Sequence, residues 1–337
     1  MIAPVNEQLG QYAEYFIYFA AASYAVSFIM FALDFAKSAA ARPVAAGAGA
    51  ETVAVGGASG GGASAALPAG GRYADSEMNY TRGELRPQGR AAVAVMVIGA
   101  LIHGAAVVSR AIAVHRVPWG NMYEFCTSGA FIVAIVFLAA LVKKDLRFLG
   151  TFVTGLVTLM LCAAAIGFPT PVGNLVPALQ SYWLVIHVSI AVFSSSLFTL
   201  TFAMAVLQLL QSRRAARIDA TGKDTMPVLR KVPSALALEN LAYRINIVAF
   251  ILWTFTLIAG AIWADKAWGR YWGWDTKEVW TFVIWTVYAA YLHARATRGW
   301  TGVRSAWLSI VGYACIIFNF AVVNVFFSGL HSYSGLK

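Results

Sequence analysis

Residues 243–297 read YRINIVAFILWTFTLIAGAIWADKAWGRYWGWDTKEVWTFVIWTVYAAYLHARAT, and they contain two long apolar runs, 243–264 and 278–297. The stretch that joins the runs, WGRYWGWDTKEVW at 268–280, holds four tryptophans together with glycines and charged residues. A helix of about 20 mainly apolar residues crosses the roughly 30 Å hydrocarbon core of a bilayer. The segment therefore predicts two membrane-spanning helices joined by an aromatic loop at one membrane surface.

The rest of the chain has the same character. It is 60% hydrophobic and only 12% charged, with a mean hydropathy of +0.68, which is far from the balance of a soluble domain. Because lipid offers no partner for backbone polar groups, apolar runs of this length are expected to form helices. We predict an all-α integral membrane protein, a bundle of about eight transmembrane helices with an external tryptophan-rich loop. The expected spans lie near 12–35, 91–114, 123–142, 148–167, 181–210, 243–264, 278–297 and 305–328.

Basic residues alternate between the loops of this bundle. Of the 25 lysines and arginines, 19 lie in four segments: between the first two spans, and after the third, fifth and seventh. Basic loops stay on the cytoplasmic side of a membrane. We therefore expect both termini and the tryptophan-rich loop on the outer face. The net charge of +10 then reflects topology, and no nucleic-acid partner is needed to explain it.

The chain divides into three expected regions. Residues 1–35 would form an N-terminal transmembrane helix, which we interpret as retained because no basic segment precedes its long apolar run. Residues 36–90 would form a flexible cytoplasmic linker, since 43–71 are nearly all alanine, glycine, serine and valine. Residues 91–337 would form one transmembrane domain that includes the tryptophan segment, 264–280.

Cysteine usage offers no metal or disulfide site. Cys126, Cys162 and Cys315 stand alone inside expected helices, with no CxxC pair. We interpret them as small packing residues.

The tryptophan segment permits two interpretations. Its indoles could form an interfacial belt, which is ordinary in membrane proteins, or cover a large planar ligand such as a porphyrin. A belt needs only one or two indoles per helix end, and it does not explain the acidic residues and glycines in the same segment. The ligand hypothesis selects Trp268, Trp272, Trp274 and Trp280 together with Asp275. A second reading of Asp275, as the N-cap of the helix that follows, remains open.

Two histidines flank this segment in the chain on the expected outer side. His187 lies near the outer end of the span 181–210, and His331 follows the last span. If these spans are neighbours, the two imidazoles can approach one site from opposite sides, as the axial ligands of a haem iron must. Arg270 and Lys277 would then pair with the haem propionates. An isolated histidine at a helix end is also commonly a packing residue, so both readings stay open.

A third histidine, His293, lies near the cytoplasmic end of the span 278–297. A buried ionisable group in a membrane is costly without a role or a partner. No second histidine is available on that side, so a bis-histidine site there would require another subunit. His103 and His115 are second-rank candidates, for which structural and functional roles are equally open.

These residues resemble a known family, the CcsA/ResC type of cytochrome c biogenesis protein, whose actinobacterial members are often called CcsB. The stretch WGRYWGWDTKEVW is similar to the tryptophan-rich WWD haem-binding loop of that family. Four further segments match in order and topology, and the resemblance runs from about residue 90 to the end of the chain. They are PWGNMYEF at 118–125, QSYWLVIHV at 180–188, YAAYLHAR at 288–295 and FSGLHSY at 327–333.

The resemblance implies that the chain handles haem b, as substrate and ligand, within the system II cytochrome c synthase (haem lyase). His187 and His331 would be axial ligands of an outer haem under the WWD loop. His293 would be a ligand of an inner haem, with its partner supplied by a CcsB/ResB-type subunit. The implied partners are this subunit, an apocytochrome c with a CxxCH motif, and thiol-reducing proteins upstream.

The resemblance also implies transport of haem across the membrane and thioether attachment on the outer face. The Ala/Gly/Arg-rich composition favours a bacterial cell membrane over a thylakoid membrane.

Three other functions remain as alternatives. A system I protein would deliver haem to a chaperone, and a b-type cytochrome would transfer electrons. A transporter or scaffold with an aromatic girdle would bind no haem.

Overall fold

The computed structural model describes residues 4–40 and 86–331, and these residues form helices and the turns between them. The α-helices are α1 (Glu7–Ala40), α3 (Pro87–Ala113), α4 (Met122–Lys143), α5 (Gly150–Cys162), α6 (Tyr182–Thr221), α7 (Ala235–Trp268), α8 (Thr276–Arg298), α9 (Val303–Ile317) and α10 (Val323–Phe326). Two π-helical turns, η2 (Ala163–Gly167) and η5 (Phe318–Val322), continue α5 and α9. Three 3-10 turns complete the described helices: η1 (Arg147–Leu149), η3 (Pro177–Leu179) and η4 (Pro227–Lys231).

The helix starts follow local capping chemistry. The side chains of Asn121, Ser181, Ser234 and Asp275 accept backbone N–H groups at the first turns of α4, α6, α7 and α8. Such side chains satisfy N–H groups that have no partner within the helix. Glycines in the left-handed region end three of the same helices: Gly222 after α6, Gly269 after α7 and Gly299 after α8.

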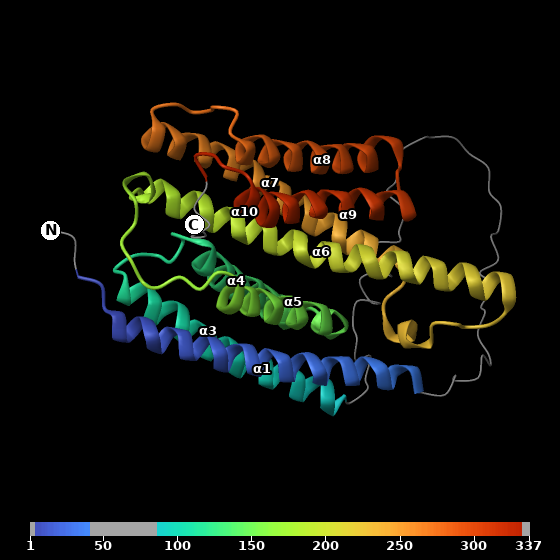
Figure 1. Ribbon diagram of the computed structural model, residues 1–337. Helices are drawn as coiled ribbons and strands as arrows, with labels where there is room; N and C mark the ends of the chain where they lie inside the picture. Colours follow the sequence, from blue (N-terminus) through green and yellow to red (C-terminus); the bar gives the residue numbers. More distant parts are fainter. Residues whose placement is uncertain (1–3, 41–85, 332–337) are drawn as a thin grey trace.

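The helices run roughly side by side along one axis (Figure 1). Helix α1 packs against α3 and α5, α6 packs against α7, α4 and α9, and α8 packs against α9 and α7. The two ends of the bundle therefore gather segments that are distant in the chain. One end holds the loop between α7 and α8, the start of α6 and the segment after α10 (Figure 1).

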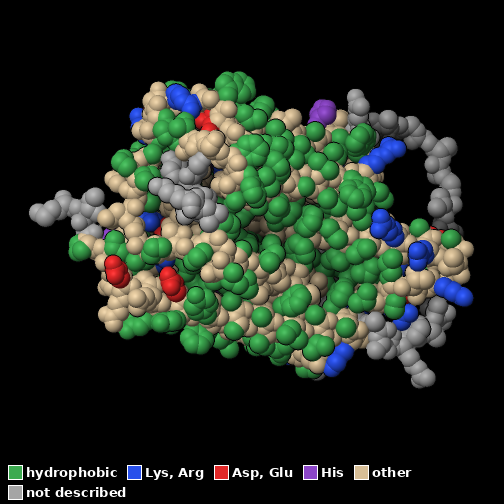
Figure 2. Space-filling model, in the orientation of Figure 1, with side chains coloured by type: hydrophobic (Ala, Val, Ile, Leu, Met, Phe, Trp, Pro, Cys, Tyr) green, Lys and Arg blue, Asp and Glu red, His purple; other side chains and the backbone are tan. Residues whose placement is uncertain are grey.

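Within the described residues, seven helical segments are long and apolar enough to cross a membrane. They correspond to seven of the eight predicted spans. The remaining predicted span, 278–297, forms most of α8, which has 23 residues but is less apolar because of its tryptophan, tyrosine, threonine and histidine residues. Hydrophobic side chains cover much of the middle of the visible face (Figure 2). Lysine and arginine side chains lie toward the two ends of the bundle. The prediction of an all-α integral membrane protein is confirmed.

The boundaries of the expected regions can be compared with these helices. Helix α1 extends to Ala40 and α3 begins at Pro87, so both helices enter the range 36–90 expected as a linker. Residues 41–85, which contain the Ala/Gly-rich stretch, lie outside the described residues.

His103 is buried where α1, α3 and α4 meet. Its Nε2–H donates to the Thr127 carbonyl at 2.9 Å, and its Nδ1 lies 3.4 Å from the Tyr24 hydroxyl. The ring also makes edge contacts with Tyr24 and Phe131. Both ring nitrogens are thus engaged in joining three helices, which is a structural role.

Candidate functional site

A cavity of about 270 Å³ opens among α4, α5, α6, α7, α8 and α9. Its walls are mainly apolar, and both His187 and His331 line it. The wall also includes Trp119, Phe125, Met160, Trp253, Trp263, Tyr271, Trp272, Lys277, Glu278, Thr281 and Tyr313. The cavity therefore brings together two histidines that lie 144 residues apart in the sequence.

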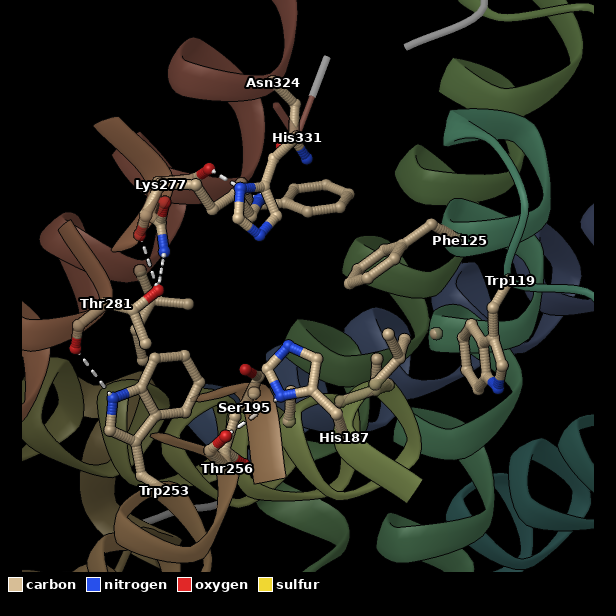
Figure 3. A pocket seen from close by; sticks show the side chains of 18 of the residues that line it. Trp119, Phe125, His187, Ser195, Trp253, Thr256, Lys277, Thr281, Asn324 and His331 are labelled. Atoms are coloured by element: carbon tan, nitrogen blue, oxygen red, sulfur yellow. Dashed lines mark hydrogen bonds between the residues drawn. The ribbon is translucent and has the colours of Figure 1, made fainter. Parts of the chain in front are cut away.

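His187 lies in the second turn of α6 and points into the cavity (Figure 3). Its Nδ1 lies 2.9 Å from the Thr256 carbonyl of α7. A carbonyl oxygen only accepts, so Nδ1 carries the proton and Nε2 keeps its lone pair. A hydrogen bond of this kind fixes the tautomer and orientation of an imidazole that binds a metal through its other nitrogen.

His331 lies opposite His187 across the cavity (Figure 3). Its Nδ1 donates to Asp275 Oδ2 at 2.6 Å, which leaves Nε2 toward the cavity. The other Asp275 oxygen accepts the backbone N–H of Leu330 at 3.0 Å. The bond from His331 lowers the pKa of the Asp275 carboxyl from its ordinary value, although partial burial opposes this shift. The carboxylate thus holds the segment after α10 against the start of α8.

Asp275 is at the same time the N-cap of α8, so that interpretation is confirmed. It forms a capping box with Glu278, whose Oε2 accepts the N–H groups of Gly273 and Asp275 at 2.8 and 3.0 Å. Glu278 therefore satisfies backbone N–H groups of the tryptophan loop, while Asp275 caps α8 and orients His331.

Two tryptophans contact the histidines, and a third lines the cavity. Trp263 is buried, stacks on His187 with ring centroids 5.9 Å apart, and meets the edge of His331 at 5.5 Å. Trp268 contacts His331 at 4.9 Å and Trp263 at 4.7 Å. Trp272 lines the cavity from the loop. These indoles give the site a largely apolar, aromatic wall at the end where α7 meets the loop to α8.

The opposite wall comes from the start of α4. Glu124 is fully buried and accepts from Arg116 Nη1 at 2.7 Å and from the Gly120 N–H at 2.7 Å. These bonds fix the turn before α4, and Trp119 and Phe125 face the cavity from this side (Figure 3). Phe125 also packs against Phe320 at 4.9 Å, which joins this wall to η5.

Trp268 and Asp275 contact His331 without lining the cavity, and three further residues selected from the sequence also lie off it. Trp280 packs against Phe318 at 4.2 Å, and Trp274 is 77% exposed with a φ of 60°. The Arg270 guanidinium lies where a Cβ on Gly273 would be, so residue 273 has to be glycine for this packing. Arg270 thus packs within the loop itself.

The remaining histidines lie elsewhere. His293 is exposed near the last turn of α8, away from the cavity. His115 is exposed in the turn after α3, with a φ of 53°. Within the described residues, neither is brought to His187 or His331.

Sequence reasoning missed three residues of α7 that support His187: Thr256, Gly260 and Trp263. Their spacing of four and three residues places them on one face of the helix. The sequence could therefore have predicted that the three residues share a face of the helix, but nothing in it indicated that this face packs against His187.

Comparison with known proteins identifies the family. Residues 119–331 match the family model of the cytochrome c assembly protein, which covers the whole cavity-bearing part of the described chain. A cytochrome c biogenesis protein CcsA from Guillardia theta is 36% identical over 236 residues, which is 65% of this chain and 77% of that protein. A CcsA protein from a strain of Prochlorococcus marinus is 34% identical over 242 residues, which is 64% of this chain and 75% of its own length.

The similarity covers a larger share of the chain in another relative. The CcsA protein of Gloeobacter violaceus is 31% identical over 296 residues, or 74% of this chain and 86% of that protein. The family model and these relatives agree with the resemblance seen in the motifs. The chain therefore belongs to the cytochrome c assembly protein family, as a membrane protein of the CcsA type that acts in cytochrome c biogenesis.

Proposed function

We propose that this chain binds haem b between His187 and His331 and presents it on the outer face for attachment to an apocytochrome c. The observation that supports this most directly is that the two imidazoles have the same hydrogen-bonding arrangement. Each is held through Nδ1, by the Thr256 carbonyl or the Asp275 carboxylate, and each directs Nε2 to the same cavity.

The donor set fits a haem better than a bare metal ion. Within the described residues there is no group of three or more histidine, cysteine, aspartate or glutamate side chains that could hold a metal. A structural zinc ion takes four such ligands, whereas a haem iron receives four nitrogens from the porphyrin and needs only two axial ligands. The apolar wall with Trp263 and Trp272 suits the porphyrin faces and edges.

In this proposal the protein contributes position more than acid or base chemistry. Addition of a cysteine thiol across a haem vinyl group forms one C–S bond and moves the thiol proton to the other vinyl carbon, with no net oxidation. The apocytochrome supplies the two thiols of CxxCH and a histidine that replaces one axial imidazole. The task of His187 and His331 is to hold the iron and to allow that exchange.

The chain would act as one subunit of a cytochrome c synthase. The exposed position of His293 at the last turn of α8 supports an inner haem site completed by a CcsB/ResB-type subunit. Thiol-reducing proteins would keep the CxxCH cysteines reduced. The proposed setting is a bacterial cell membrane, with the cavity end and both termini outside, and haem would cross from the inner site to the outer one.

The first test is the haem content and absorption spectrum of the purified chain. We expect a low-spin bis-imidazole spectrum in the wild type, and its loss or conversion to high spin in His187→Ala and in His331→Ala. A matched variant, His115→Ala, alters an exposed histidine outside the cavity and should leave the spectrum unchanged. An unchanged low-spin spectrum in both cavity variants would overturn the assignment.

A second experiment separates a synthase from an electron-transfer cytochrome. The chain is expressed with its partner subunit and a CxxCH apocytochrome, and covalent haem is measured after denaturation. We expect attachment in the wild type and its loss in His331→Ala. A haem-loaded complex that attaches none to CxxCH would favour the electron-transfer alternative.

A further inference from the structure

Lys277 places an amino group on the cavity wall, which is a cation when it is protonated. The residue lies in the first turn of α8, and its side chain reaches the cavity beside His331 (Figure 3). The ammonium donates to the Asn319 carbonyl at 3.2 Å and to Asn324 Oδ1 at 2.5 Å. Both acceptors are neutral, and an ammonium has three N–H donors.

No carboxylate of the described residues forms an ion pair with Lys277. The nearby Asp275 is engaged with His331, Leu330 and the start of α8. Glu278 also lines the cavity: its Oε2 accepts two loop N–H groups, its Oε1 is buried without a hydrogen-bond partner, and its charge lies at the positive N-terminus of a helix. Among the described residues, the Lys277 side chain therefore faces the mainly apolar cavity with hydrogen bonds to neutral acceptors and no ion-pair partner.

A cation in apolar surroundings is costly unless an anion or several hydrogen bonds compensate it. The two neutral acceptors give Lys277 part of that compensation and hold it at the wall. They come from η5 and α10, and π-helical turns such as η5 are frequent at functional sites. A negatively charged group of the ligand would supply the missing counter-charge at this position.

We propose that Lys277 anchors a carboxylate of the ligand, so that the cavity selects a carboxylated tetrapyrrole over a neutral one of the same shape. This inference rests on the proposed function. The sequence offered two cations, Arg270 and Lys277, as partners of the haem propionates, and the structure favours Lys277. Arg270 does not line the cavity, because its guanidinium packs over Gly273 within the loop.

The test compares haem with haem dimethyl ester, in which both carboxylates are neutral. Purified chain freed of haem is titrated with each compound, and binding is followed through the low-spin absorption spectrum. A hydrogen bond to a charged group contributes about 1.5–3 kcal/mol, so the wild type should bind the free acid about 10- to 100-fold more tightly than the ester.

Two variants separate the charge of Lys277 from its structural bonds. Lys277→Met removes the charge and both hydrogen bonds, whereas Lys277→Gln removes the charge but keeps donors for Asn319 and Asn324. Both should bind acid and ester equally, while the low-spin spectrum persists because His187 and His331 are intact. A purely structural role would weaken the binding of both compounds alike and preserve their ratio.

Lys266→Met is the matched control, since Lys266 is an exposed lysine near the end of α7 whose side chain is 60% exposed. It should keep the full preference for the acid. Equal binding of acid and ester by the wild type, an unchanged ratio in both Lys277 variants, or loss of the preference in Arg270→Met alone would each overturn the anchor. Failure of the wild type to bind either compound would overturn the proposed function itself.

Discussion

Gly260 of α7 lies directly against the imidazole of His187 on α6. A Cβ on residue 260 would come within 2.7 Å of His187 Cε1 and 2.9 Å of Nδ1, and real contacts of this kind are not that short. Gly260→Ala should therefore push the ring away and break its bond to Thr256. We expect the low-spin spectrum to be lost or to become high spin.

Gly129→Ala is the control for this substitution. Gly129 lies in α4 and lines the same cavity, but a Cβ there would meet Met160 at an ordinary 3.5 Å. It should keep the low-spin spectrum. Identical spectra for the two alanine variants would mean that the position of the His187 ring is not critical.

Asp275→Asn keeps a good helix N-cap but replaces the anionic partner of His331 with a neutral amide. Loss of the group that hydrogen-bonds to a metal-binding histidine typically weakens metal binding 10- to 100-fold, so the affinity for haem should fall by about that factor. Haem titration measures the loss, and circular dichroism should show unchanged helix content. Asp265→Asn, on a carboxylate paired with Lys266, serves as the control and should bind normally. Equal affinities for the two variants would argue against an orienting role for Asp275.

Trp263→Leu should affect the site far more than Trp274→Leu. Trp263 makes ring contacts with His187, His331 and Trp268, and aromatic pairs contribute about 0.5–1.5 kcal/mol each. Haem binding should weaken by about tenfold or more in Trp263→Leu. Trp274 is mostly exposed, so its variant should retain the haem content of the wild type. Haem content after purification is the readout, and the reverse ranking would contradict the geometry.

His293→Ala should leave the spectrum of the isolated chain unchanged, because this residue is exposed and distant from the cavity. Its effect should appear only when the chain is purified with its partner subunit, as a loss of part of the bound haem. Haem per complex, measured with and without the partner, checks both statements. A spectral change in the isolated chain would place His293 in a site within one chain.

His103→Leu should reduce stability without changing haem binding. The substitution leaves the Tyr24 hydroxyl and the Thr127 carbonyl without their buried partner. An unpaired buried polar group costs about 1–3 kcal/mol, so the free energy of unfolding should fall by about that amount. Thermal denaturation in detergent measures the loss. An altered haem spectrum with unchanged stability would instead give His103 a functional role.

The helices of this fold were predictable because hydropathy in a bilayer is a strong constraint. Each predicted span falls within or close to one helix of the structure, since a helix must satisfy its backbone across the whole membrane. The helix ends were less well located: α7 begins at Ala235, eight residues before its predicted span. The extension of α6 to Thr221 was not foreseen, because its last turns are polar and leave the apolar pattern. The π-helical turn η5 was also missed, since one additional residue in a helical turn leaves no mark on composition.

The site was predictable in its histidines and less so in its surroundings. His187 and His331 stand out because ionisable rings are rare near apolar runs, and the structure brings them to one cavity. The sequence also singled out Trp274, Trp280 and Arg270, which lie off the cavity. Which side of a loop faces inward depends on backbone geometry, here the positive φ of Trp274 and the close approach of Arg270 to Gly273, and these are not visible in residue types.

The two imidazoles are mounted on different supports. His187 belongs to a 40-residue helix packed against α7, whereas His331 lies five residues beyond α10 and is held by Asp275 and by ring contacts with Trp263 and Trp268. Separating His331 and Leu330 from that carboxylate breaks two hydrogen bonds and bends no helix. In the proposed exchange of ligands, an incoming histidine would therefore displace His331, which lies outside the helices, more easily than His187, which lies within one.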